Sequence, residues 1–210
     1  ESDQRHLFLF GAILCFAMAC LSKPTAMTFP LLAILIDYLC IRSFRWHDYI
    51  YLGVLAIIFA IATAMIQGLG GAFEMLAGVP FTAKLFNAAV ALGRYFFKMF
   101  WPTDLAVQCI HRWPRLPLFV WPGLITCAVV GSIFAISVWR CVQNEVYKKN
   151  PVCEGIRVLA VSIGFFLLSL APTLGVAGFG YHAFADRFTY LPAIGLSILL
   201  GCGFLMCSGF

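Results

Sequence analysis

Seven runs of apolar residues, separated by short polar stretches, set the strongest limit on what this chain can fold into. Most of the runs approach the length that a helix needs to cross a bilayer, roughly 17 to 25 residues. They occupy residues 7–21, 26–41, 49–66, 85–101, 118–139, 158–174 and 191–210. Helices satisfy their backbone hydrogen bonds internally, as lipid requires. We therefore predict an all-α fold, a polytopic membrane helical bundle.

Composition agrees with this class. Hydrophobic residues make up 62% of the chain and charged residues only 11%, whereas charged residues are about 25% of a typical soluble domain. The net charge of +5 comes from basic residues in short loops and at segment ends, as membrane topology requires, so we expect no nucleic-acid partner. The nine cysteines show no C-x-x-C motif and no zinc-ligand spacing, so we expect no metal site.

The first two runs are joined by SKPTAMTFP, residues 22–30. One helix over 7–41 would be about 50 Å long, too long for a single crossing of a hydrocarbon core of about 30 Å. Pro24 and Pro30 lack an amide donor and disfavour helix in the preceding residue, so the sequence predicts a turn or re-entrant corner. Lys23 in this corner either binds a phosphate together with neighbouring hydroxyls or extends to the membrane surface from a helix end.

The run at 85–101 differs from the others because cations interrupt it. Arg94 and Lys98 lie four residues apart and share one face of a helix. A lipid-facing helix loses a few kcal/mol for each charge near its centre, so we predict an interfacial or bundle-facing helix that does not cross, with about six spanning helices around it. The two cations either form a shelf for a lipid-linked phosphate, with Tyr95 and Trp101 as interface anchors, or point toward ordinary lipid headgroups.

The densest polar stretch, YHAFADRFTYLP at 181–192, precedes the last apolar run. Asp186 and Arg187 are adjacent, so on a helix they point in different directions, and one can face the bundle while the other meets a ligand. If the segment is helical, His182 shares a face with Asp186, as in an imidazole oriented by a carboxylate. The alternative is a helix start with solvated charges at the interface. We hypothesise that this stretch, SKPTAMT and GRYFFKMFWP are the walls of one polar site.

Six crossings would place these three stretches on the same side of the membrane. The basic residues are divided equally between the two sides, so the positive-inside rule does not decide the orientation. We expect the motif-bearing loops on the non-cytoplasmic side, with the loops near 42–48 and 140–157 in the cytoplasm.

Three pieces in this order, LSKPTAMTFPLLAILIDYL, GRYFFKMFWPTDLAV and ADRFTYLPAIGL, resemble the membrane portion of the transmembrane and tetratricopeptide-repeat proteins. That family includes protein O-mannosyltransferases, and the resemblance is greatest to its bacterial relatives. It runs from about residue 21 to about residue 196. It implies a GT-C-like glycosyltransferase fold, a polyprenyl-phosphate-linked sugar such as mannose as donor, and a protein or glycan as acceptor. The membrane would be the bacterial inner membrane, or the endoplasmic reticulum membrane in a eukaryote.

The resemblance also implies roles for individual residues. Cations stabilise the charge that grows on a phosphate as it leaves. The four cations assigned to the donor phosphate are Lys23, Arg94, Lys98 and Arg187. The catalytic candidates are Asp186 and His182, and the candidates for orienting the substrate are Asp104 and Tyr190. No cofactor is implied beyond the lipid-linked sugar itself.

Two features of the family have no counterpart in this sequence. The acidic residue taken as catalytic base belongs to a first lumenal loop that would precede residue 7, and the tetratricopeptide repeats would follow residue 210. Residues 1–6 do not form the charged start of a signal peptide, so we expect residues 1–210 to be a single membrane-embedded domain of a longer protein. The competing hypotheses are a non-catalytic membrane anchor for a repeat domain and a transporter segment, whose polar groups would lie near the middle of the membrane.

Overall fold

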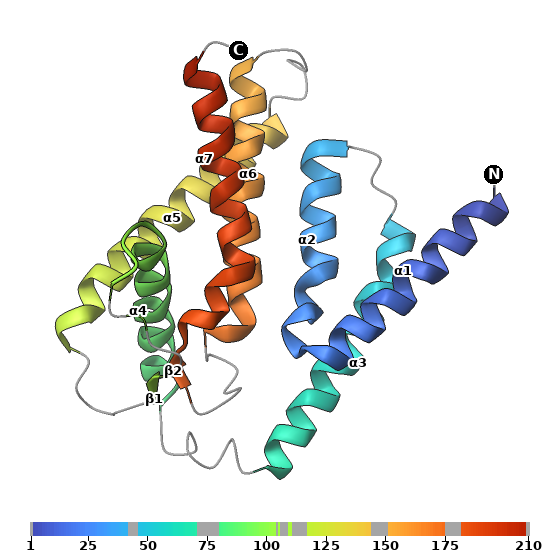
Figure 1. The fold of residues 1–210 in the computed structure, drawn as a ribbon, viewed down its shortest axis with the longest axis horizontal. Coiled ribbons are helices and arrows are strands. Elements are labelled where there is room, and N and C mark those ends of the chain that lie inside the picture. The colour runs from blue at the N-terminus through green and yellow to red at the C-terminus, as the bar shows by residue number, and fades with distance from the viewer. Residues whose placement is uncertain are drawn as a thin grey trace.

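The computed structural model of the chain describes residues 2–41, 46–70, 80–103, 105, 109–110, 117–143, 151–174 and 182–208. Within these residues the fold is helical, as predicted. The helices are α1 (Ser2–Ser22), α2 (Phe29–Ile36), α3 (Trp46–Leu69), α4 (Phe81–Phe100), α5 (Pro117–Gln143), α6 (Pro151–Leu170) and α7 (Tyr190–Ser208) (Figure 1). Two short strands, β1 (Cys109–Ile110) and β2 (His182–Phe184), pair antiparallel.

Four segments of the described chain are long and apolar enough to cross a membrane. They are Tyr49–Leu69, Trp121–Gln143, Glu154–Thr173 and Asp186–Leu205. Two further apolar helices, His6–Ser22 and Pro24–Leu39, are shorter than these four segments. The chain is therefore a helical membrane protein, and the described residues contain four full-length candidate spans where the sequence predicted about six.

The corner between the first two apolar runs is confirmed. α1 ends at Ser22, Lys23 is extended, and the short 3-10 helix η1 (Pro24–Thr28) leads into α2. The Thr28 hydroxyl donates a hydrogen bond to the Thr25 carbonyl oxygen at 3.1 Å, which satisfies one of the backbone groups that the break releases. The Thr28 hydroxyl therefore stabilises the backbone of the corner.

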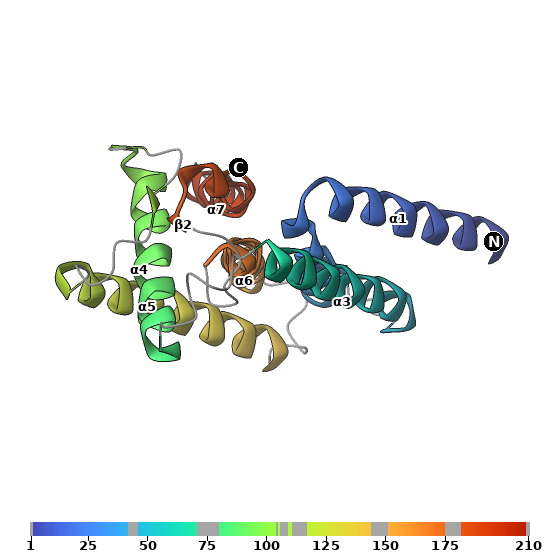
Figure 2. The same ribbon diagram turned by 90° about the horizontal axis from the view of Figure 1, so that it is seen from below.

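α4 packs across the bundle and not along it. In Figure 2, α6 and α7 are seen nearly end on, whereas α4 is seen along its length. The middle of α4 is buried continuously from Asn87 to Gly93, and α4 is not among the candidate spans of the described residues. The prediction of a bundle-facing helix in this run is therefore confirmed.

Small residues allow α4 and α5 to approach closely. A side chain on Gly123 of α5 would lie 2.8 Å from both the Ala89 carbonyl oxygen and the Val90 Cα atom of α4. On α4, a side chain on Gly93 would lie 3.0 Å from the Gly123 Cα atom. Lipid provides little hydrophobic drive for helix association, so such close backbone contact is a main source of stability between membrane helices.

A buried cluster joins α4 to the long pair α6 and α7, which pack against each other. Its members from α4 are Ala91 and Tyr95, and those from α6 are Phe166 and Leu170. Leu196 of α7 completes the cluster. Because these side chains come from three helices, the cluster sets where the end of α4 lies relative to the start of α7.

Replacement of Gly123 by alanine should weaken the α4–α5 crossing. The new methyl group meets backbone atoms that cannot rotate away, so the helices must separate, and we expect a loss of about 1–3 kcal/mol in the free energy of unfolding. Unfolding in mixed detergent micelles, followed by circular dichroism, measures this change. Gly131→Ala is the matched control on the same helix, because nothing lies within 4 Å of a side chain there. Equal stability of the two variants would contradict the crossing as described.

Candidate functional site

The candidate site is a pocket between the C-terminal end of α4 and the start of α7. Its volume is about 290 Å³, near the lower end of the range for small-molecule sites. Polar walls come from Lys98, Asp186, Thr189 and Ser197. The apolar part of the lining consists of Met99, Phe100, Pro102, Leu105, Ala193, Leu196 and Leu200.

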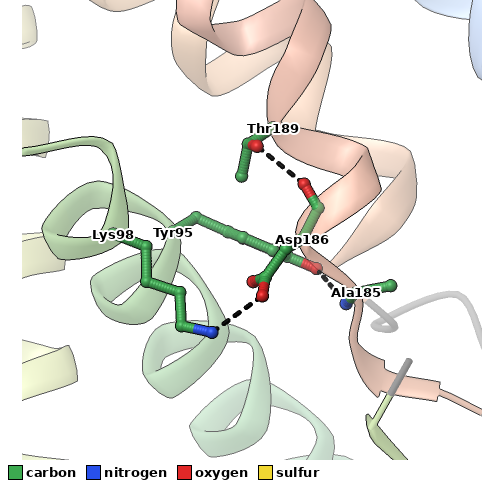
Figure 3. Close-up of polar contacts among 5 residues, drawn as sticks. All are labelled: Tyr95, Lys98, Ala185, Asp186 and Thr189. Atoms are coloured by element: carbon green, nitrogen blue, oxygen red, sulfur yellow. Dashed lines mark hydrogen bonds and ion pairs between the residues drawn. The ribbon is translucent and has the colours of Figure 1, made fainter. Parts of the chain in front are cut away.

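An ion pair crosses the polar end of this pocket. The Lys98 ammonium nitrogen lies 2.8 Å from Oδ2 of Asp186, although the two residues are 88 positions apart in the sequence (Figure 3). Their side chains are only 17% and 13% exposed. The separation is that of a charge-assisted hydrogen bond, and the low exposure means that water screens the pair weakly.

The turn that carries Asp186 is held by hydrogen bonds on both of its sides. Before it, Ala185 is extended, and its amide donates to the hydroxyl oxygen of Tyr95 at 3.0 Å. Asp186 is the first residue of the 3-10 helix η6 (Asp186–Thr189). Within this helix the Thr189 hydroxyl donates a hydrogen bond to the Asp186 carbonyl oxygen at 2.6 Å (Figure 3). The backbone of Asp186 is thus anchored to α4 and to the first turn that leads into α7.

Tyr95 is the buried support of this turn. Its side chain is fully buried, with 0% exposure. Burial raises the pKa of Tyr95 to about 12; the Ala185 amide opposes this shift, and the negative charge of Asp186 adds to it. The expectation that Tyr95 is an interface anchor is therefore wrong, because its ring packs with Phe166 and Leu170. Trp101, by contrast, is 74% exposed.

The remaining predicted phosphate ligands lie outside the pocket lining. Arg94 is half-buried one turn before Lys98 on α4, and Lys23 is exposed in the corner after α1. Arg187 is exposed, with its guanidinium carbon 5.3 Å from the centre of the Phe188 ring. The structure brings the predicted cation Lys98 into direct contact with the predicted acid Asp186.

His182 and Asp186 do not share a helical face. His182 lies in β2, opposite Ile110 in the β1–β2 register, and the following backbone stays extended to Ala185. Strand pairing overrides the four-residue spacing on which the prediction depended. The side chain of His182 and the whole of Asp104 lie outside the described residues.

The other substrate-orienting candidate, Tyr190, begins α7 with its side chain 78% exposed. The neighbouring polar residues Thr189 and Ser197 do line the pocket, but sequence reasoning did not select them. No charge or unusual spacing distinguishes them. Tyr95 had one available signal, because it precedes Lys98 by three positions and so lies on the same side of α4.

The pocket combines charged, hydroxyl and apolar groups. Within the described part of the chain, no group of three or more His, Cys, Asp or Glu residues could hold a metal ion. The chemistry of the pocket is that of one cation, one carboxylate and two hydroxyls beside an apolar wall.

A comparison of the chain with family models, curated proteins and solved structures finds no match. The family resemblance therefore depends on the three quoted motifs.

A double-mutant cycle should detect the coupling between Lys98 and Asp186. Lys98→Gln and Asp186→Asn each remove one charge of a weakly screened pair, so we expect each to lower the free energy of unfolding by about 1–3 kcal/mol. The double variant should lose about 1–2 kcal/mol less than the sum of the two. Arg187→Gln, at an exposed neighbour, should change stability by less than about 0.5 kcal/mol. If the losses of the two single variants add up to the loss of the double variant, the interaction between Lys98 and Asp186 contributes nothing to the free energy of unfolding.

Tyr95 should titrate in a distinct high-pH phase. The pKa of about 12 lies above the usual pKa of about 10 for a phenol, so the contribution of Tyr95 to stability is complete below about pH 10 and is lost as pH rises through 12. Absorbance at the phenolate wavelength should show a late phase that disappears in Tyr95→Phe. Tyr190→Phe, which removes an exposed phenol, should leave that phase unchanged. Persistence of the late phase in Tyr95→Phe would assign it to another group.

Proposed function

We propose that this chain is the membrane portion of a GT-C-type glycosyltransferase-like protein and that its α4–α7 pocket binds the phosphate end of a polyprenyl-phosphate-linked sugar. The sugar, such as mannose, would pass to a protein or glycan acceptor on the lumenal or periplasmic face. The observation that supports the proposal most directly is the Lys98–Asp186 pair at one end of an otherwise largely apolar pocket.

The lining that α7 contributes is mostly apolar. Thr189 precedes α7 beside Asp186, and Ala193, Leu196 and Leu200 follow at helical spacing, with Ser197 as the one polar lining residue of this helix. The seven steps from Ala193 to Leu200 extend about 10 Å along the helix axis. An amphiphile with a phosphate at one end and an aliphatic chain at the other would match this order of side chains.

The cations provide the electrostatic part of the proposal. Lys98 is mostly buried, and at an effective dielectric constant of about 20 an ammonium attracts a unit negative charge 4 Å away by about 4 kcal/mol before desolvation is counted. Arg94 and Arg187 are close to Lys98 and Asp186 in the sequence and would add positive potential around the mouth of the pocket. Such charges favour a leaving phosphate more strongly as its negative charge grows.

The same proposal includes an arrangement in the membrane. α1 and α2, joined by the corner at η1, would act as two short or tilted crossings, which with the four longer spans would make six. α4 would then lie near the non-cytoplasmic surface, and the pocket would open there. Lys23 stays a candidate for the donor phosphate, and His182, Asp104 and Tyr190 stay candidates for contacts to the sugar or the acceptor.

The main alternative is a membrane anchor without catalytic function. One observation favours it, because the Lys98–Asp186 pair and the Tyr95–Ala185 hydrogen bond also fasten the start of α7 to α4. In an anchor, these contacts would serve stability alone. Phosphate binding at Lys98 therefore separates the two functions.

Lys98→Gln should weaken the binding of a lipid phosphate. We expect dodecyl phosphate to bind the wild-type chain in phosphatidylcholine nanodiscs and to bind Lys98→Gln at least about tenfold more weakly, because a charge-assisted hydrogen bond is lost. Equilibrium titration measures both dissociation constants, and dodecanol serves as the uncharged probe.

Lys84→Gln is the matched control for this experiment. Lys84 lies in the first turn of the same helix and outside the pocket lining, so its replacement should leave the affinity unchanged. Equal affinities of the wild type, Lys98→Gln and Lys84→Gln for dodecyl phosphate would support the anchor instead.

A further inference from the structure

We propose that Asp186 determines the specificity of the α4–α7 pocket by admitting phosphates that carry hydroxyl groups and disfavouring phosphates that do not. This inference depends on the proposed function, because it takes Lys98 as the phosphate ligand. It assigns Asp186 a role in recognising the ligand headgroup and not in the transfer step.

The Asp186 carboxylate lies beside the cation that would bind the phosphate. Oδ2 of Asp186 is 2.8 Å from the Lys98 ammonium, so any phosphate that binds this ammonium comes within a few ångströms of the carboxylate. Two negative groups at that separation repel each other, and weak screening in a mostly buried site increases the repulsion. A phosphate without other functional groups therefore competes with Asp186 for the same cation.

The backbone that carries Asp186 is held beside Lys98. The Ala185 amide is bonded to the buried Tyr95 hydroxyl at 3.0 Å, and the Thr189 hydroxyl is bonded to the Asp186 carbonyl oxygen at 2.6 Å. These two contacts hold the backbone on either side of the carboxylate. The side chain is only 13% exposed, and its carboxylate lies in the pocket wall.

A ligand of this pocket meets both the ammonium and the carboxylate. An ionised carboxylate only accepts hydrogen bonds, so hydroxyl groups near the phosphate would donate to Asp186 while the phosphate contacts Lys98. Such a ligand offers a partner to both charges. A phosphate without hydroxyl donors leaves the carboxylate facing another anion, and a site built to bind hydroxyls rejects analogues that lack them. Phospholipids whose headgroups carry no hydroxyl would thus be disfavoured.

The experiment compares two probes in two proteins. The probes are dodecyl phosphate and the dodecyl phosphate ester of glucose, and the proteins are the wild-type chain and Asp186→Asn, with Lys98→Gln titrated in parallel, all in phosphatidylcholine nanodiscs. We expect Asp186→Asn to bind dodecyl phosphate about tenfold more tightly and the glucose ester about tenfold more weakly. Each probe is compared with itself across the two proteins, so the different charges of the probes do not affect the result.

Two further variants control for charge and folding. Glu154→Gln removes the same charge from an exposed position in the first turn of α6 and should shift neither affinity. Asp186→Ser, which is neutral and smaller, should repeat the opposite shifts if Asp186→Asn fails to fold, as judged by its helical circular dichroism and melting temperature.

The other outcomes have separate meanings. If Asp186→Asn binds both probes more tightly, Asp186 only competes for Lys98, and its recognition of hydroxyls is refuted. If it binds both equally or more weakly while Lys98→Gln binds neither, this inference fails and the proposed function stands. If Lys98→Gln binds both probes as the wild type does, the phosphate site at Lys98 fails, and the inference fails with it.

Discussion

The contact between the end of α4 and the turn before α7 is the interaction on which the candidate site depends. It has a buried part, the hydrogen bond from the Ala185 amide to the Tyr95 hydroxyl oxygen, and a charged part, the Lys98–Asp186 pair. Tyr95 and Lys98 are three positions apart on α4, so one side of this helix supplies both the buried support and the cation of the pair. Inside a membrane protein a backbone amide without a partner costs several kcal/mol. The fully buried phenol therefore explains how a short irregular segment can end beside the apolar core.

α4 can make this contact because its direction differs from that of α6 and α7 (Figure 2). The crossing at Gly93 and Gly123 brings its backbone against α5, and its middle is buried by the surrounding helices. A charge at the end of such a helix faces a pocket and avoids lipid, which removes most of the cost that a lysine would have within a span. The amphiphilic lining of the pocket follows from the same geometry, since α7 begins at the polar turn and continues as an apolar helix.

Local sequence predicted some of these features and missed others. The proline corner at residues 22–30 and the bundle-facing helix around Arg94 follow from rules about proline and buried charge that need no knowledge of neighbours. The assignment of Tyr95 to the interface failed because aromatic residues near helix ends serve both surfaces and cores, and only the packing of Phe166 and Leu170 distinguishes them. The prediction that His182 and Asp186 share a helical face failed because β1, about 70 positions earlier in the sequence, pairs with the segment that contains His182.

The sequence by itself therefore determined the class of the protein. Its apolar runs are long enough to require helices in a membrane, and its charges are few enough that Lys98 and Asp186 could be selected as candidates from the residue pattern. Only the tertiary structure decided that these two residues are partners, that Tyr95 supports them, and that Lys23 lies outside their pocket. The physical reason is the range of the interactions: helix length and proline breaks act within a few residues, whereas the ion pair joins positions 88 apart and depends on how α4 crosses the bundle.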